Sequence, residues 1–200
     1  TIGVMSPEGS LAVVARQILQ QHGLEPGKDV NLVTMGGDSV RLPALQAKAI
    51  QATLFNTGMS LQAQKEGFTK LAAAADYASV IEGGLAAPND KIKQNPDKIL
   101  RFVRAAVKGL QFFVTKRDAA LKIMMETSRM TDHALANAIY DIQTKLTLRT
   151  GFSDDKTLQT MINDMIKTTK VKRDVKVGDV FELSFVKKVN DGLKAAGWQP

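Results

Sequence analysis

Three short polar segments hold the residues best suited to binding a small molecule. Each follows a short apolar run and precedes a stretch of helical pattern: SPEGS at 6–10, GGDS at 36–39 and NTG at 56–58. Backbone N–H groups at a helix start, with hydroxyls nearby and glycine allowing close approach, can bind an anion or a polar group. The residues predicted to bind such a ligand are Ser6, Gly9, Ser10, Gly36, Gly37, Asp38, Asn56 and Thr57.

Ordinary helix capping is the alternative role for the same side chains. Ser6 or Ser10 is of the type that caps a helix start. Asp38 is suited to proton transfer as an acid or base, but we predict that it caps its own helix through its side chain. The first turn directly follows a predicted strand, and this position keeps ligand binding open beside capping.

Few other residues point to chemistry. Cysteine is absent, which excludes disulfides, thiolate nucleophiles and cysteine metal sites. His22 and His133 stand far apart without partners at metal-site spacing, and neither G-x-S-x-G nor H-E-x-x-H occurs. The segment GLEPGKD at 23–29 is a turn, because no Ser or Thr follows its lysine as in a phosphate-binding loop. We therefore predict no catalytic residues, no metal site and no cofactor.

The net charge of +7 favours an anionic ligand, an acidic surface or nucleic acid as partner. The densest basic run, KTTKVKRDVK at 167–176, has no aromatic residue within it on which a base could stack. We therefore expect a solvated surface segment there and no nucleic-acid partner. The longest apolar runs are far shorter than the roughly 20 residues that a membrane-spanning helix needs.

The elements that must position the three polar turns alternate between strand and helix. Strands are predicted at 1–5, 31–35 and 52–55, and a further strand at 69–75. Helices are predicted between them: one carries Val14 and Leu19 on its apolar stripe and ends at Gly23, and the others cover about 40–49 and 59–66. Such alternation predicts a parallel sheet, and parallel sheets bind ligands at the carboxyl ends of their strands.

The pattern changes after residue 80. Residues 81–87 form a glycine-interrupted extended stretch, suited to crossing between two lobes. Beyond it we predict helices at about 99–110, 119–126, 133–146, 154–166 and 184–196, the last ending at Gly197, and a short extended piece at 175–180. The first part of the chain is therefore predicted to be α/β and the remainder mostly helical.

An ordered set of segments carries a resemblance to a known family. The set comprises the strand-turn-helix at 1–19, RLPALQAKAIQATLF at 41–55, GGLAA at 83–87, IKQNPD at 92–97, and the stretches 151–165 and 180–185. In this order they resemble the solute-binding proteins of ABC importers for sulfonate, nitrate and thiamine-precursor-like compounds. That family usually has glycine near Lys48 and aspartate near Gln51, so we expect a reshaped turn before the third strand.

The resemblance implies a periplasmic type II binding fold, with one parallel-sheet lobe and a mainly helical return segment of the other lobe. The domain prediction that it implies is an α/β ligand-binding lobe at 1–82, followed at 83–200 by a hinge strand and the helical part of the other lobe. It implies capture of a small polar or anionic solute, without catalysis, and delivery to an ABC permease from the periplasm or envelope. It also implies that an N-terminal half-lobe is missing or comes from a partner chain. The alternatives are a pyrimidine-precursor synthase of the same fold, whose cysteine-rich motif is lacking here, and a nucleic-acid-binding module.

Overall fold

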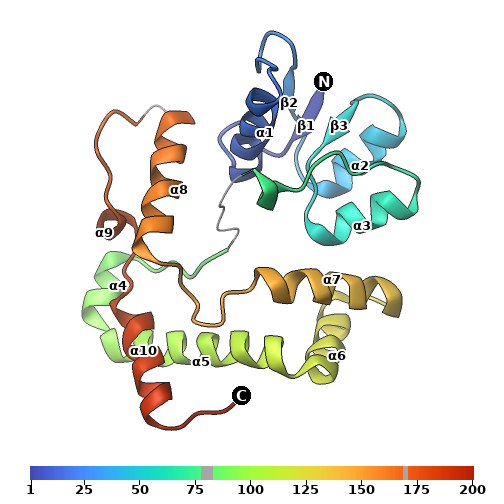
Figure 1. Cartoon of the computed structure of the whole chain (residues 1–200). Helices are drawn as coiled ribbons and strands as arrows, with labels where there is room; N and C mark the ends of the chain where they lie inside the picture. The colour runs from blue at the N-terminus through green and yellow to red at the C-terminus, as the bar shows by residue number, and fades with distance from the viewer. Residues whose placement is uncertain (78–82, 169–170) are drawn as a thin grey trace. The chain divides into compact units, whose positions relative to one another are not determined.

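The computed structural model describes residues 1–77, 83–168 and 171–200. The chain divides into two compact units (Figure 1). The first comprises Thr1–Glu82 and Asn163–Lys172, and the second comprises Gly83–Ile162 and Arg173–Pro200. The first unit is α/β and the second is helical, so the structure confirms a mixed α/β chain that is mostly helical.

The first unit is built around a three-stranded parallel sheet in the order β2-β1-β3. The strands are β1 (Ile2–Val4), β2 (Leu32–Thr34) and β3 (Ala52–Thr53). The central strand pairs with both neighbours, with Ile2 opposite Leu32 on one side and Ala52 on the other. All three predicted strands exist and are parallel, but each is shorter than the sequence pattern indicated.

Three helices follow the three strands in turn. They are α1 (Ser10–Gln21), α2 (Asp38–Gln46) and α3 (Thr57–Lys65). The α1 stripe packs as its periodicity predicts, because Val14 is fully buried and Leu19 is 7% exposed. Gly23 ends this helix region at a φ of +72°, in the left-handed conformation that glycine adopts without strain.

The further strand predicted at 69–75 is wrong. The described residues there form no strand, and a single 3-10 turn, η1 (Ala74–Asp76), closes the segment. The segment buries little, since Leu71 is 82% exposed and its other apolar residues are mostly small alanines. Without apolar area to bury, the segment has no reason to join the sheet. Part of the extended stretch predicted at 81–87 lies outside the described residues, and 83–88 form neither helix nor strand.

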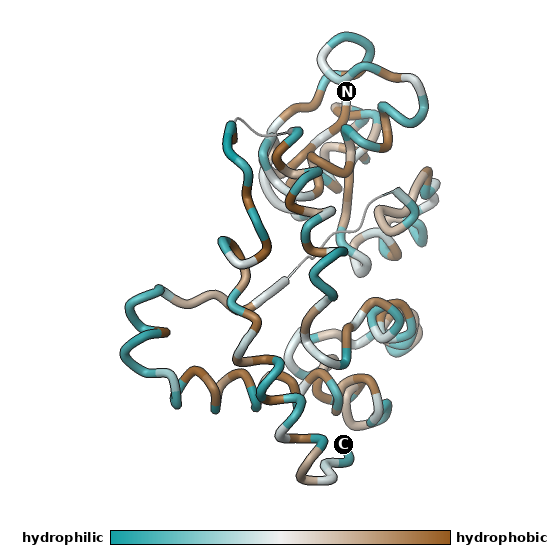
Figure 2. Tube along the Cα trace, turned by 60° about the vertical axis from the view of Figure 1, so that its left-hand side comes forward, coloured by the Kyte–Doolittle hydropathy of each residue, from teal (hydrophilic) through white to brown (hydrophobic). Residues whose placement is uncertain are grey.

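The second unit is an assembly of helices around a small core. Its helices are α4 (Asn89–Gln94), α5 (Pro96–Thr115), α6 (Arg117–Ser128), α7 (His133–Leu146), most of α8 (Asp155–Thr168), α9 (Val177–Val180) and α10 (Ser184–Ala195). Hydrophobic and hydrophilic positions alternate around the turns of these helices (Figure 2). The core joins α5 to α10 through Val107, Val186, Val189 and Leu193.

The extended piece predicted at 175–180 is wrong, because Val177–Val180 form the short helix α9. The Asp179 carboxylate accepts a hydrogen bond from the backbone N–H of Lys176 at 2.9 Å and closes the turn. The β-branched valines favoured an extended prediction, but this side-chain cap decides the local conformation. The longer helices predicted from apolar periodicity are all present, with ends that shift by a few residues.

Candidate functional site

The three polar turns lie at one edge of the sheet. Because the strands are parallel, their carboxyl ends point the same way, and each leads directly into a helix start. The residues at these helix starts are Gly9 for α1, Gly37 for α2 and Asn56 for α3. The sheet edge, which we define as residues 5–10, 35–39 and 54–57, therefore gathers three helix N-termini, as the sequence predicts.

Two of these helices begin without a side-chain cap. Gly9 and Gly37 have extended backbone at the N-cap position, and neither offers a side chain that could accept a hydrogen bond from the first turn of its helix. The expectation that Ser6 or Ser10 caps α1 is therefore wrong, since Ser10 is already the first helical residue. Backbone N–H groups at the starts of α1 and α2 are left for solvent or for a ligand.

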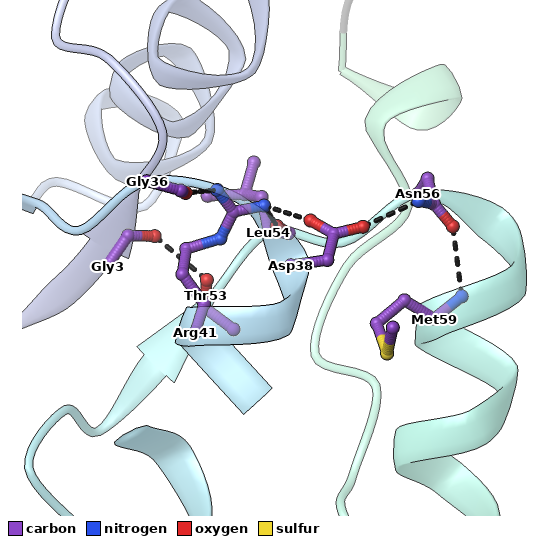
Figure 3. Close-up of polar contacts among 8 residues, drawn as sticks. All are labelled: Gly3, Gly36, Asp38, Arg41, Thr53, Leu54, Asn56 and Met59. Atoms are coloured by element: carbon purple, nitrogen blue, oxygen red, sulfur yellow. Dashed lines mark hydrogen bonds and ion pairs between the residues drawn. The ribbon is translucent and has the colours of Figure 1, made fainter. Parts of the chain in front are cut away.

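The predicted capping role of Asp38 is also wrong. Asp38 is the first residue of α2, one position too far along the chain to cap it. One carboxylate oxygen accepts from the guanidinium of Arg41, and the other accepts from the side-chain amide of Asn56 at 2.5 Å (Figure 3). Both oxygens of Asp38 thus accept hydrogen bonds from other side chains, and the bond from Asn56 links α2 to the start of α3.

Arg41 is the group that joins two of the turns. Its guanidinium donates to the backbone carbonyls of Gly36, after β2, and Leu54, after β3, the latter at 3.1 Å (Figure 3). The side chain is only 2% exposed, while that of its partner Asp38 is 19% exposed. A buried cation is stable only when it is paired and hydrogen-bonded, and these three acceptors meet that need. Its Nε is buried without a hydrogen-bond partner in the described part of the chain.

Asn56 serves the third helix in the way expected of a cap. Its side-chain oxygen accepts from the backbone N–H of Met59 at 2.9 Å, while its amide nitrogen donates to Asp38. The two contacts together fix the side chain in one orientation, with the cap on one end and the carboxylate on the other (Figure 3). Thr57 is the first residue of α3 and lies next to this link.

The turn after β1 is held by its own contacts. Arg16 of α1 donates to the carbonyl of Pro7 at 2.7 Å, and the backbone N–H of Gly9 donates to the carbonyl of Ser6 at 3.3 Å. The Ser6 hydroxyl donates to Glu8 at 3.3 Å. Arg16 thus fixes the loop to the helix that follows it, which holds Gly9 at the edge of the sheet.

The structure therefore brings the predicted residues together in two groups. Gly36 and Asp38 accept hydrogen bonds from Arg41, and Asp38 also accepts one from Asn56. Gly37 and Thr57 lie beside these residues in the chain. The remaining residues, Ser6, Gly9 and Ser10, lie on the turn of the central strand at the same edge. Arg41 was not predicted from the sequence as part of the site. Its signal was an arginine three residues after Asp38, the spacing of an ion pair on one side of a helix.

The turn before the third strand, which we predict to be reshaped relative to the family pattern, contains one residue with left-handed backbone. Lys48 has a φ of +59°, a left-handed conformation that is costly for any residue with a Cβ. Glycine adopts this conformation without strain, so a lysine here carries a cost that a glycine would not.

Titratable groups with shifted pKa values lie in the second unit. The hydrogen bond from Arg117 lowers the pKa of Asp141. The backbone N–H and the hydroxyl of Thr157 lower the pKa of Asp154, which caps the start of α8. The hydrogen bond from Ser184 lowers the pKa of Glu182. In each case a donor stabilises the charged carboxylate, and the contact is one that fixes a helix.

Neither the two histidines nor the cavity beside His133 forms a second candidate site among the described residues. His22 lies at the end of α1, and its Nε2 is 3.0 Å from the hydroxyl of Tyr77. His133 begins α7 and lines a cavity whose other lining residues, from α6, are Asp118, Leu121, Lys122, Met125 and Glu126. Among the residues that the structure describes, no group of three or more His, Cys, Asp or Glu could hold a metal ion. None of the helices in those residues is long and apolar enough to cross a bilayer.

Comparisons with known proteins identify the family. The family model described as NMT1/THI5 like matches residues 1–120 of the 200-residue chain. This match covers the whole sheet, its three helices and α5. Comparisons with curated proteins and with solved structures gave no match. The chain belongs to the NMT1/THI5-like family, which comprises the solute-binding proteins of ABC importers for sulfonate, nitrate and thiamine precursors together with thiamine pyrimidine synthases.

Proposed function

We propose that this protein is the substrate-binding component of an ABC importer. It captures a small polar or anionic solute, of the sulfonate, nitrate or thiamine-precursor kind, and delivers it to a permease in the membrane. The protein acts in the periplasm or elsewhere at the cell envelope. It binds its solute without changing it, by closing two lobes of a type II binding fold about a hinge. In this proposal the sheet unit is one of these lobes.

The observation that carries this proposal is the pair of uncapped helix starts at one sheet edge. Glycine occupies the N-cap positions of α1 and α2, and no side chain caps either helix. Helix N-termini bear partial positive charge and free N–H donors, which together favour an anion or a strongly polar group. In this proposal Ser6, Ser10 and Thr57 add hydroxyl groups to the binding surface.

The Arg41 contacts explain how this surface is kept in shape. Backbone N–H donors bind well only when they are held in place before the ligand arrives. Arg41 links the turn after β2 to the turn after β3, and Asp38 extends the link to Asn56. In this proposal Asp38 and Arg41 position the binding groups, while Gly36 and Gly37 leave room for the solute to approach the backbone.

Gly37 offers a direct test. A Cβ built there meets no atom within 4 Å, and the φ of −70° suits any residue, so Gly37→Val is expected to fold normally. The added side chain covers the start of α2. We expect the wild-type protein to bind at least one member of a panel of taurine, methanesulfonate, nitrate and hydroxymethylpyrimidine in calorimetric titration. We expect Gly37→Val to weaken that binding by at least about tenfold, a loss of about 1.4 kcal/mol.

Gly192→Val is the matched control. A Cβ there also meets nothing within 4 Å, but Gly192 is an exposed residue of α10 in the second unit, outside the sheet edge. This variant is expected to bind as the wild type does, and both variants are expected to melt close to the wild-type temperature. If no panel member binds, or if Gly37→Val binds as tightly as Gly192→Val does, the proposed binding surface is wrong.

The protein prepared for the titration also distinguishes solute binding from the synthase activity found within the family. The sequence has no cysteine, and its two histidines belong to different units, His22 to the first and His133 to the second. We therefore propose solute binding without catalysis. Chromatography of the solute after prolonged incubation is expected to return it unchanged, and appearance of a pyrimidine product would assign the chain to the synthases.

A further inference from the structure

The outer face of α5 carries a row of positive charges. Lys98, Arg101, Arg104 and Lys108 are spaced three, three and four residues apart, which places them along one side of the helix. With a rise of about 1.5 Å per residue, the row extends over about 15 Å. Asp97 is the one acidic residue in α5, so this face is strongly basic. We call these four cations the α5 basic row.

The row is available to a partner. Lys98, Arg101 and Arg104 are exposed, and none of the four cations forms an ion pair among the residues that the structure describes. Lys108 instead lies over the ring of Trp198, with Nζ 3.7 Å from the ring centroid. Trp198 is held in turn by a hydrogen bond from its Nε1 to Gln111 at 2.8 Å. The charges of the row are therefore not neutralised by neighbouring carboxylates.

An exposed aromatic residue borders the row. Phe102 follows Arg101 directly and is 60% exposed, although it belongs to a helix whose opposite side is buried. That opposite side packs on α10 through Val107, which is 2% exposed. The outer face of α5 thus combines a line of cations with one large apolar side chain at its border. Exposed apolar area next to basic residues is typical of surfaces that rest on a lipid bilayer.

We propose that the outer face of α5 docks on a membrane surface rich in anionic phospholipid. The α5 basic row contacts the phosphate groups, and Phe102 enters the boundary between headgroups and acyl chains. Each Lys or Arg near such a surface strengthens binding by about fivefold, so the four cations together supply several hundredfold. This docking goes beyond the proposed solute binding, because it uses the helical unit and needs no solute.

The same observations disfavour single-stranded nucleic acid as the partner, and duplex DNA is left as a competitor in the test. Binding of single strands relies on aromatic faces on which successive bases stack. The Trp198 ring is already covered by Lys108 on one face, and Phe102 stands alone beside the row. Docking on an anionic bilayer requires only a row of cations and one apolar side chain that can enter it.

The test compares two triple variants of the full chain. Lys98→Gln/Arg101→Gln/Arg104→Gln removes three charges of the row. The control, Lys122→Gln/Lys156→Gln/Lys188→Gln, removes three exposed charges on α6, α8 and α10 of the same unit. Both change the net charge equally. Co-sedimentation is measured with vesicles of phosphatidylcholine alone and of phosphatidylcholine with an equal part of phosphatidylglycerol, at about 0.1 M salt, where charges act over about 10 Å.

We expect the wild type to bind the anionic vesicles and not the neutral ones. The row variant is expected to lose about 100-fold in affinity, while the control stays within about threefold of the wild type. Phe102→Ser is expected to lose about tenfold, whereas Ile123→Ser, at a residue 50% exposed on α6, changes little. The proposal is overturned if the wild type ignores anionic vesicles, if both triple variants lose equally, or if duplex DNA binds more tightly than the vesicles.

Discussion

Replacing Arg41 with methionine tests the physical basis of the sheet edge. Methionine fills much of the space of the arginine stem but carries no charge and no N–H donor. The change removes the ion pair to Asp38 and the hydrogen bonds to the carbonyls of Gly36 and Leu54. Because the pair is buried on the arginine side, removal of one partner is expected to cost about 3–5 kcal/mol of unfolding free energy. That is a large part of the stability of a typical domain.

The assay must report on the sheet unit. The only tryptophan, Trp198, belongs to the second unit, so its fluorescence would follow the wrong part of the chain. Amide hydrogen exchange of β1 and β2, read by mass spectrometry or NMR, measures the opening free energy where Arg41 acts. Exchange in α5 and α10 serves as the internal reference and is expected to change much less.

A double-mutant cycle separates the ion pair from the rest of the network. Asp38→Asn keeps the shape of the side chain but removes the charge opposite Arg41, and it is combined with Arg41→Met. The coupling free energy is expected to lie between about 0.5 and 3 kcal/mol, because the two groups are in direct contact. Arg104→Met is the matched surface change, expected to cost no more than about 0.5 kcal/mol. A loss below about 1 kcal/mol for Arg41→Met, or equal losses for Arg41 and Arg104, would refute the assigned role.

Three further predictions concern packing, backbone strain and charge. Gly3→Ala places a Cβ 2.8 Å from the Cδ1 of buried Ile50, so we expect it to lower the free energy of unfolding in urea by about 1–3 kcal/mol. Adding Ile50→Val is expected to restore part of this loss, and a double variant that shows no recovery would contradict the contact. Lys48→Gly relieves the left-handed backbone and is expected to stabilise the first unit by about 0.5–1 kcal/mol in the same assay, and destabilisation would show that the conformation is unstrained. Arg117→Gln is expected to raise the lowered pKa of Asp141 toward 3.8 in an NMR titration, and an unchanged pKa would exclude the pair as its cause. Since that pKa is depressed in the folded state, the stabilising effect is present above the unfolded value of about 3.9 and is lost as the pH falls through the folded pKa.

The local pattern of the chain was sufficient to predict most elements. The apolar stripe of α1, the long amphipathic α5 and the glycine ends at Gly23 and Gly197 follow from periodicity and backbone preference within a few residues. The three parallel strands followed from the alternation of strand and helix. These features depend on interactions within short stretches of sequence, so the sequence alone shows them.

Short and weakly apolar segments were predicted less well. The segment 69–75 has too little apolar area to join the sheet of its own unit, and its alanines do not favour a strand. The valines of 175–180 favour extended backbone, but Asp179 caps that segment as a helix. In both segments the intrinsic conformational preference of the residues contributes less free energy than one hydrogen bond or one buried side chain. Their conformation is therefore set by what lies beside them and not by their own residues.

For the candidate site, the sequence determined which turns meet but not how their side chains are used. Strand alternation alone places the three helix starts at one edge. Only the folded chain decides that Asp38 pairs with Arg41 and Asn56 instead of capping α2, and that Arg41 is buried. Asp38 and Asn56 are 18 positions apart and follow different strands, so their contact depends on the pairing of those strands in the sheet and leaves no periodic trace in the sequence. Hydrogen-bond partners of buried charges are chosen by tertiary proximity, and that choice exists only once the sheet has formed.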